Sequence, residues 1–241
     1  MNYFLRLGIV LLLLSLGMFY SVRRGKLTLP AAATGGVLGL LIYLGDGLTG
    51  LALLALFFAL GTAASGWRGA DKRRLGLAEE NQGRRTTGQV MANASVAAGL
   101  GLLAWQWPAH APLAALMLAG SFAAATADTL SSELGNVYGR RYYNILTGRP
   151  DTRGLNGVVS LEGTVLGLAG SGVVAAVYGL SFGGGGATFG VLLLAGTAGN
   201  LLDSVLGATL ERRGVLGNNA VNFLNTLTGA LMAGGLGRWL G

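Results

Sequence analysis

Long apolar runs separated by short polar connections dominate the hydrophobic pattern of the chain. A helix that crosses a bilayer needs roughly 20 apolar residues. The runs that reach or approach this length are residues 4–22, 30–45, 47–66, 88–106, 112–134, 158–180, 187–209 and 220–239. The pattern predicts an all-α fold, a polytopic integral membrane helical bundle of about eight transmembrane helices. We expect residues 1–241 to form a single integral membrane domain.

The connections between these runs alternate between basic segments and segments without Arg or Lys. Basic residues gather in the connections 23–26, 68–85, 140–153 and 212–213, whereas the connections 45–47, 108–112 and 181–186 hold none. Positive charge near helix ends stays in the cytoplasm, so the alternation predicts that both termini lie outside. A signal peptide is a weaker interpretation of the first run, because Arg23 and Arg24 follow it without a small-residue cleavage site. We expect that run to remain as an anchor.

The composition favours lipid as the main solvent of the chain. Hydrophobic residues make up 52% of the sequence and charged residues only 11%, which is too little charge for a water-soluble surface. The net charge of +7 does not indicate a nucleic-acid partner, because the basic residues lie in short clusters between apolar runs. The sequence has no cysteine and one histidine, His110, which excludes thiolate zinc sites, catalytic thiols and histidine-based metal clusters. The 43 glycines predict close packing of helix backbones.

A weak internal repeat links the two halves of the C-terminal region. Residues 131–135 and 203–207 each end an apolar run at a basic connection, and the Asn-containing segments 156–160 and 218–222 follow. The match suggests a parallel duplication of a helix, loop and helix unit. Chance similarity within a low-diversity apolar sequence is the alternative.

Carboxyl groups close to the bilayer are the first candidates for chemistry. Four of them lie within or at the cytoplasmic ends of apolar runs: Asp128, Glu133, Glu162 and Asp203. A carboxylate in the bilayer core costs on the order of 3 kcal/mol or more, so it needs a partner or a wet cavity. Together with the hydroxyls of Ser132 and Ser204, these acids form the oxygen-rich environment that Mg²⁺ prefers. We expect the four acids to be metal ligands.

Two different roles for the acids stay open. The acids could instead pair with interfacial arginines, namely Arg140, Arg141, Arg212 or Arg213, and only fix the loops. A proton or cation relay is the second possibility.

Amides, hydroxyls and arginines near the same ends are candidates for phosphate binding. The expected residues are Arg84, Arg85, Gln89, Asn93, Ser132, Arg149, Arg153, Asn156, Ser160, Ser204, Asn218 and Asn222. Several of the amides begin predicted helices, where free N–H groups and the positive dipole end favour phosphate. The arginines lie in Gly- and Thr-rich loops, and a guanidinium matches phosphate oxygens, although no Walker A motif is present. Interhelical hydrogen bonds and ordinary positive-inside loops are the competing interpretations.

The motifs resemble those of one membrane protein family. The segments that carry the resemblance are residues 89–93, 127–135, 156–164, 203–209 and 218–222, and it extends from about residue 30 to the end. They look like the family that contains transmembrane protein nineteen and the plant and cyanobacterial phytyl-phosphate kinases, long described as a domain of unknown function. They are more distantly similar to the CTP-using dolichol and phytol kinases.

The resemblance implies transfer of a phosphoryl group from a nucleoside triphosphate, with CTP preferred, to a phytyl, geranylgeranyl or polyprenyl phosphate. It implies that Asp128, Ser132, Glu133 and Asp203 are catalytic or Mg²⁺-binding groups, and that Asn93, Asn156, Asn218 and Asn222 bind phosphates.

The expected protein is thus a Mg²⁺-dependent lipid-phosphate kinase of the plasma membrane, with Asp128, Glu133 and Asp203 as catalytic residues and a site that faces the cytoplasm. Its partners would be the isoprenyl-phosphate lipid, the nucleotide and the bilayer, and the lipid tail would lie in a lateral groove between Gly-rich helices. An ion-coupled transporter or lipid flippase that uses the intramembrane carboxylates is the alternative, and it predicts an inverted repeat. A non-catalytic membrane scaffold is the third.

Overall fold

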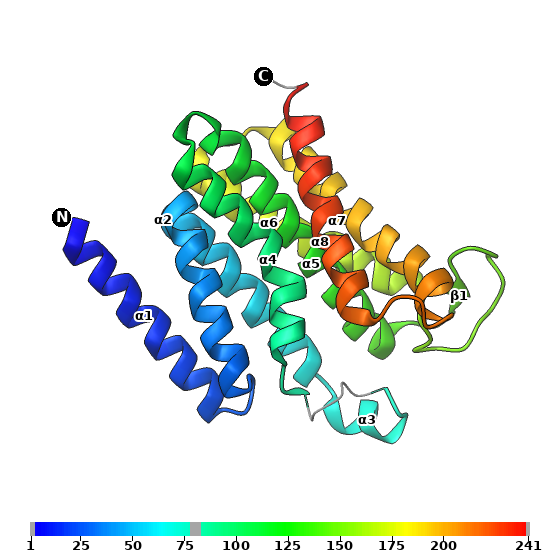
Figure 1. Cartoon of the computed structure of the whole chain (residues 1–241). Coiled ribbons are helices and arrows are strands. Elements are labelled where there is room, and N and C mark those ends of the chain that lie inside the picture. Colours follow the sequence, from blue (N-terminus) through cyan, green and yellow to red (C-terminus); the bar gives the residue numbers. More distant parts are fainter. Residues whose placement is uncertain (1–2, 78–82, 240–241) are drawn as a thin grey trace.

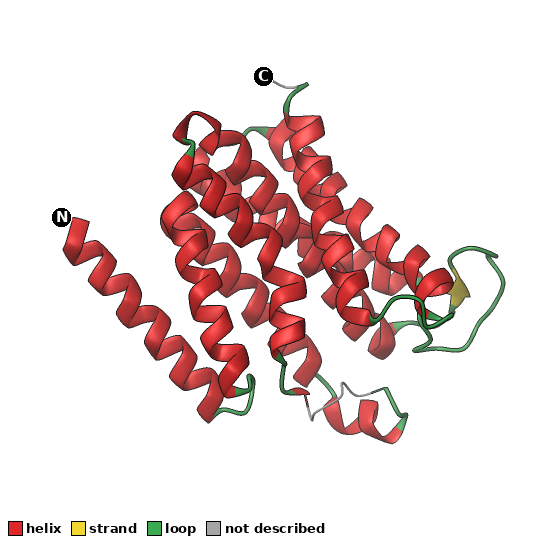
Figure 2. Ribbon diagram, viewed as in Figure 1, coloured by secondary structure: helices red, strands yellow, loops and turns green. Residues whose placement is uncertain are grey.

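The computed structural model describes residues 3–77 and 83–239 and is almost entirely helical (Figures 1 and 2). The long helices are α1 (Tyr3–Arg23), α2 (Leu29–Gly66), α4 (Thr87–Gln106), α5 (Ala111–Tyr138), α6 (Leu161–Phe182), α7 (Gly186–Leu206) and α8 (Asn218–Gly237). Among the described residues, 5 helical segments are long and apolar enough to cross a membrane, and they contain α1, α2, α5, α6 and α7. The predicted polytopic helical membrane protein is therefore confirmed, whereas the count of eight spans stays a prediction.

The helix α2 reverses direction at Gly47. This residue has φ 61° and ψ −145°, values that only glycine adopts readily. A Cβ atom built on Gly39 would lie 3.3 Å from Leu54 Cδ2, although a straight helix would separate the two residues by about 22 Å. The two arms therefore form a helical hairpin, which Figure 1 shows as two adjacent blue segments. Its tip falls between the predicted runs 30–45 and 47–66.

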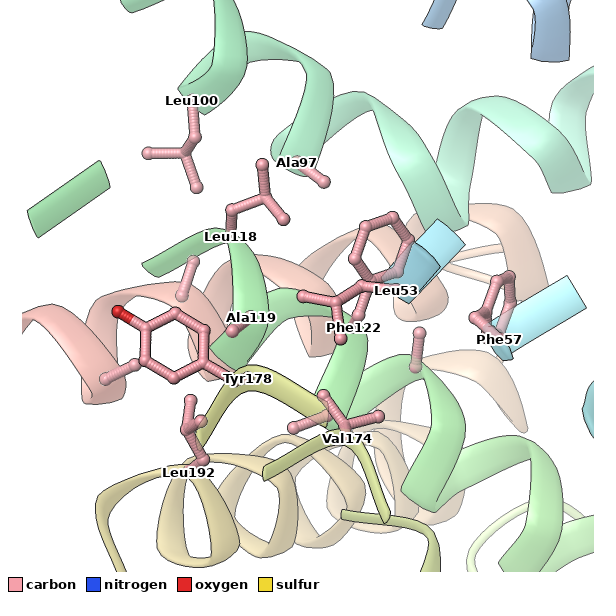
Figure 3. Packing of buried hydrophobic residues seen from close by; sticks show 14 of the residues in the cluster. Leu53, Phe57, Ala97, Leu100, Leu118, Ala119, Phe122, Val174, Tyr178 and Leu192 are labelled. Carbon is pink, nitrogen blue, oxygen red and sulfur yellow. The ribbon is translucent and has the colours of Figure 1, made fainter. Parts of the chain in front are cut away.

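The helix α5 lies at the centre of the bundle and contacts α2, α4, α6, α7 and α8. Its middle is lined with small buried residues, and Ala123, Ala124 and Ala125 are fully buried. Larger side chains fill the space around it, and Figure 3 shows Phe122 in one cluster with Leu53 and Val174. Glycines let the backbones approach, because a Cβ on Gly120 would lie 2.5 Å from the Gly229 carbonyl oxygen. The close helix packing expected from the glycine content is present.

The basic connections lie at one end of the bundle, and the connections without Arg or Lys lie at the other end. Figure 1 shows α3, the loop with β1 and the connection from α7 to α8 at one end, while the tip of α2 and the connection from α6 to α7 lie at the other. The first group contains the predicted basic connections, of which residues 78–82 lie outside the described residues. The structure agrees with the alternation along the chain. The side of the membrane that each end faces stays a prediction.

The connections contain short elements that the sequence did not predict, and all of them except η2 lie at the basic end. These are α3 (Gly69–Arg74), the 3-10 helix η2 (Pro108–His110), the π-helix η3 (Gly207–Glu211) and the strands β1 (Tyr143–Asn144) and β2 (Val158–Val159). The strands pair antiparallel over two residues each and add a small ladder to the loop, and the all-helical fold class is confirmed. The predicted run 158–180 begins as a helix only at Leu161, because Val158 and Val159 pair as a strand and Ser160 caps α6. The internal repeat stays a prediction.

Candidate functional site

A polar cavity of about 230 Å³ opens at the basic end of the bundle. The helices α4, α5, α7 and α8 and the loop before α6 form its walls. Most of the residues expected from the sequence line it, namely Arg85, Gln89, Asn93, Asp128, Ser132, Glu133, Asn156, Ser160, Asp203, Ser204, Asn218 and Asn222. The fold thus brings together groups that are far apart in the sequence.

The carboxyl groups of Asp128 and Asp203 meet across the interface of α5 and α7. Their side chains are within hydrogen-bonding reach of each other, and Glu211 is the next acid nearby. Small residues permit this approach, because a Cβ on Gly199 would lie 2.5 Å from the Ala124 Cβ. Two carboxylates this close repel each other when both are ionised, so the pair favours a shared proton or a bound cation. This pair is the most chemically demanding feature of the cavity.

The alternative of interfacial ion pairs does not apply to this carboxyl pair. Among the described residues, neither Asp128 nor Asp203 has a salt bridge to the arginines considered from the sequence, Arg140, Arg141, Arg212 and Arg213. Arg212 is instead paired with Asp151, at 2.9 Å between Nη2 and Oδ2.

Glu133 lines the cavity, but a buried lysine neutralises its charge. The Nζ atom of Lys72 on α3 forms an ion pair with Glu133 Oε2 and donates to the Ala64 carbonyl oxygen at 2.9 Å. The Ser65 hydroxyl donates to Glu133 Oε1 at 3.2 Å. Lys72 is 2% exposed, although its neighbours Arg73 and Arg74 are exposed. No signal in the sequence pattern singles out Lys72 within this basic segment.

Four of the expected site residues lie outside the cavity lining. Glu162 Oε2 accepts a hydrogen bond from the Arg140 backbone N–H at 3.4 Å. The Arg153 guanidinium lies 5.7 Å from the centre of the Tyr142 ring, and Arg84 and Arg149 are exposed. The expected set of four metal-binding carboxylates is therefore not assembled. Among the described residues, no group of three or more His, Cys, Asp or Glu side chains could hold a metal ion.

Some amides of the cavity hold the local backbone. Gln89 Oε1 accepts from the Thr86 backbone N–H at 2.8 Å, which completes a capping box at the start of α4. The Asn93 amide donates to the Gln89 carbonyl oxygen at 2.9 Å. Asn156 does not begin a helix, contrary to expectation, because it lies in the turn before β2. These amides therefore stabilise the backbone of the cavity wall and also make the wall polar.

The start of α8 differs from the starts of α4 and α6. Thr86 and Ser160 cap α4 and α6 through their side chains, whereas no side chain caps α8. Asn218 begins α8 and lines the cavity, and its Oδ1 accepts from the Asn222 amide at 2.6 Å. The start of α8 therefore lies at the cavity wall without a side-chain cap, an arrangement that favours an anion.

The loop over the cavity is fastened to Arg212, the residue that follows η3. Arg212 Nε donates to the Asn156 carbonyl oxygen at 2.6 Å, in addition to its ion pair with Asp151. The Thr152 backbone N–H and the Arg212 guanidinium hold the pKa of Asp151 below its usual value. Gly157 has φ 74° and packs directly on Ala208, a position where a side chain would clash. The loop that carries Asn156 is thus held in place over the pocket.

Arg85 is positioned by both its backbone and its side chain. Its backbone N–H donates to the Lys26 carbonyl oxygen at 2.9 Å, and its own carbonyl oxygen accepts from Thr28 at 3.1 Å. Its guanidinium lies 5.2 Å from the centre of the Phe57 ring and packs on Gly61 of α2. Its cation is therefore held at the edge of the cavity.

Further residues of the lining were not among the expected site residues. Asn200 lies one turn before Asp203 and faces the same cavity, and Asn136, Tyr142 and Glu211 also contribute. The spacing of Asn200 and Asp203 on one helix could have identified Asn200 as a residue of the site. Glu211 could not be identified, because the π-helix that places it is not visible in the sequence pattern.

Comparison with known proteins identifies relatives over most of the chain. The family described as "Integral membrane protein DUF92" matches residues 12–230. An uncharacterized membrane protein of Synechocystis is 36% identical over 211 residues, which cover 83% of this chain and 78% of that protein. Protein VTE6, chloroplastic, of Arabidopsis thaliana is 33% identical over 221 residues, with 86% of this chain and 64% of that protein covered.

An uncharacterized membrane protein of Methanocaldococcus jannaschii is 31% identical over 202 residues, which cover 81% of this chain and 79% of that protein. No solved structure matches the chain with significant similarity. The family match confirms the resemblance drawn from the motifs. The chain belongs to the DUF92 family of integral membrane proteins.

Proposed function

We propose that this protein is an isoprenyl-phosphate kinase that transfers a phosphoryl group from a nucleoside triphosphate, with CTP preferred, to a lipid monophosphate. The observation that carries the proposal is the contact of Asp128 and Asp203 inside a cavity lined by amides and Arg85. The motifs that resemble the phytyl-phosphate kinases, at residues 127–135 and 203–209, are the segments that supply this carboxyl pair. Chemistry and resemblance thus point to the same residues.

The donor set of the cavity fits Mg²⁺. This ion is commonly bound by one or two carboxylates together with waters and substrate phosphates, so a third acid is not required. Asp128 and Asp203 would hold it, and Ser204 and Asn200 lie in the same lining. When bound, Mg²⁺ supplies positive charge that offsets the charge of the phosphate oxygens. The ion pair with Lys72 leaves Glu133 less suited to the metal.

Groups around the carboxyl pair suit two phosphate-bearing substrates. Arg85 offers a cation at one edge, and the uncapped start of α8 offers backbone N–H groups near Asn218. These groups orient the acceptor and the donor so that an acceptor oxygen bonds to the terminal phosphorus of the nucleotide. The bond from that phosphorus to its bridging oxygen breaks, and the nucleoside diphosphate leaves with the electron pair. The acceptor is already an anion, so no strong general base is needed.

The proposed topology places this chemistry at the cytoplasmic face of the plasma membrane. Both arms of the α2 hairpin, α4 and α8 cross the membrane in addition to the other long helices, which gives eight spans and both termini outside. The gathering of basic connections at the cavity end supports this orientation. We take the whole chain to be a single domain, and the contacts of α5 with helices from both halves of the chain support this.

Transfer of label from γ-labelled CTP or ATP to phytyl or geranylgeranyl phosphate in proteoliposomes tests the proposal. The variants Asp128→Asn and Asp203→Asn should each lose most of the transfer, because either change removes a charge from the carboxyl pair. Asp71→Asn is the matched control, since Asp71 is an exposed acid on α3. A wild-type protein that is inactive with every donor and acceptor would refute the proposal.

One observation favours the ion-coupled transporter as a second candidate. Polar atoms of Ser121, Thr126 and Asn225 are buried inside the bundle without a hydrogen-bond partner among the described residues. Such groups are expensive in a membrane interior and often mark a path for ions. Proton or cation flux into liposomes, abolished by Asn225→Leu, would support transport. Flux equal to that of protein-free liposomes would exclude it.

A further inference from the structure

A second, apolar cavity adjoins the polar one. It has a volume of about 410 Å³ and lies between α1, the two arms of the α2 hairpin and the start of α4. Three residues line both cavities: Arg85, Gln89 and Asn93. The apolar cavity is therefore a groove that begins where the polar site ends.

The walls of the groove are suited to a flexible hydrocarbon chain. Leucines of α1 and α2 and the rings of Phe57 and Phe58 supply apolar surface. Glycines widen it, because a Cβ on Gly17 would meet no atom within 4 Å and one on Gly35 would lie 3.9 Å from Val90. Among the described long helices, α1 makes substantial contact only with α2. This arrangement leaves the groove accessible from the side of the bundle.

The polar end of the groove carries a fixed cation. The backbone of Arg85 is hydrogen-bonded to both sides of the connection between α1 and α2, and its guanidinium stacks near Phe57 and Phe58. A cation at the end of an apolar channel matches an amphiphile with an anionic head and a hydrocarbon tail. A neutral lipid would gain binding free energy from the apolar walls but none from the charge of Arg85.

We infer that this groove binds the head-proximal part of the isoprenoid tail of the acceptor, and that Arg85 holds the acceptor phosphate where the groove meets the polar cavity. The inference rests on the proposed function and deepens it. The nucleotide then occupies the side of the cavity near Asn218 and Asn156, across from Arg85. The two substrates enter by different routes, one from the lipid and one from water.

A groove that is open at its side has a consequence for substrate choice. The stretch of α1 that lines it, from Leu13 to Ser21, is about 12 Å long. The first units of a tail are buried along this stretch, whereas later units extend into the bilayer. The enzyme should therefore discriminate against short tails and accept long ones equally.

Filling the groove without disturbing the bundle provides the test. Gly17→Leu and Gly35→Leu place a side chain in the open space of the groove, and Gly8→Leu is the control because Gly8 is exposed on the same helix α1 with no atom near a Cβ. The KM for geranylgeranyl phosphate should rise about tenfold or more in the two groove variants, since several buried methylene contacts are lost. The KM for the nucleotide should be unchanged, and Gly8→Leu should behave as wild type.

Photo-cross-linking separates this inference from the proposed function. A geranylgeranyl phosphate with a photoreactive group near its head should label peptides of α1 and α2, and excess unlabelled geranylgeranyl phosphate should compete more strongly than geranylgeraniol. If the groove variants transfer phosphate with wild-type KM values and the probe labels other peptides, the lipid site in the groove is refuted but the proposed kinase activity stands. Labelling of the groove without any phosphoryl transfer would retain the lipid site and refute the kinase. Absence of both would refute both.

Discussion

The buried ion pair of Lys72 and Glu133 should contribute strongly to stability. Lys72→Met keeps the length of the side chain but leaves Glu133 without its counter-charge, and the Glu133 side chain is only 11% exposed. Removal of one partner of a buried pair costs about 3–5 kcal/mol. We take the lower value, because Glu133 also lines a cavity that water can enter. For a chain of this size, about 3 kcal/mol corresponds to a fall in Tm of about 6–12 °C.

A double-mutant cycle in detergent isolates the pair. Thermal unfolding is measured for Lys72→Met, Glu133→Gln and the double variant, with Arg73→Met as the control because Arg73 is an exposed neighbour on α3. The double variant should recover most of the loss, since replacing both charges removes the uncompensated one. If Lys72→Met shifts Tm no more than Arg73→Met, or if the two single losses simply add, Glu133 is solvated and the ion pair does not stabilise the fold.

Three further predictions concern packing, backbone conformation and pH. Gly101→Ala should destabilise the protein by about 1–3 kcal/mol, because its Cβ would lie 2.5 Å from the Leu41 carbonyl oxygen, whereas Gly99→Ala in open space should be neutral or stabilising in the same thermal assay. Gly47→Ala should cost about 1–3 kcal/mol, because φ 61° and ψ −145° at the hairpin tip strain any other residue, and an unchanged Tm would contradict this. The pKa of Asp151 is lowered in the folded loop, so its contribution to stability is present above the usual value of 3.8 and is lost as the pH falls through the lowered value. Hydrogen exchange of residues 144–157 should therefore accelerate only below that range, and Arg212→Ala should move the acceleration to higher pH.

Much of the architecture was predictable because membrane insertion imposes strong constraints on sequence. Lipid forces each crossing segment to be a long apolar helix, so each predicted run coincides over most of its length with helix in the structure. The hairpin tip was predictable from Gly45, Asp46 and Gly47, which interrupt an otherwise continuous apolar stretch. The meeting of Asp128 and Asp203 was predictable on the same grounds, since both acids lie near the ends of apolar runs that lead into a basic connection.

The rest depended on local geometry that hydropathy does not encode. Glu162 was expected to join the other acids, but the cap at Ser160 places it in the first turn of α6, where it faces Arg140. Lys72 enters the interior only because α3 packs back against the end of α2, at Ala64. Asn156 was expected to begin a helix, and the pairing of β1 with β2 moved the helix start beyond it. Each difference arises within the loops, whose conformations are set by caps and turns rather than by lipid.

The location of the carboxyl pair explains why one fold can combine a tightly packed polar pocket with a roomy lateral groove. The pair requires rigid neighbours, and it is carried by α5 and α7, whose backbones approach through Gly199 and Ala124. The groove requires room, and it lies between α4, the α2 hairpin and α1, where the main contact of α1 within the described residues is with α2. Arg85 lies where these two regions meet, because it lines both cavities. A substrate that is polar at one end and hydrocarbon at the other is the class of ligand that uses both, which is why lipid-phosphate chemistry accounts for more of the structure than transport does.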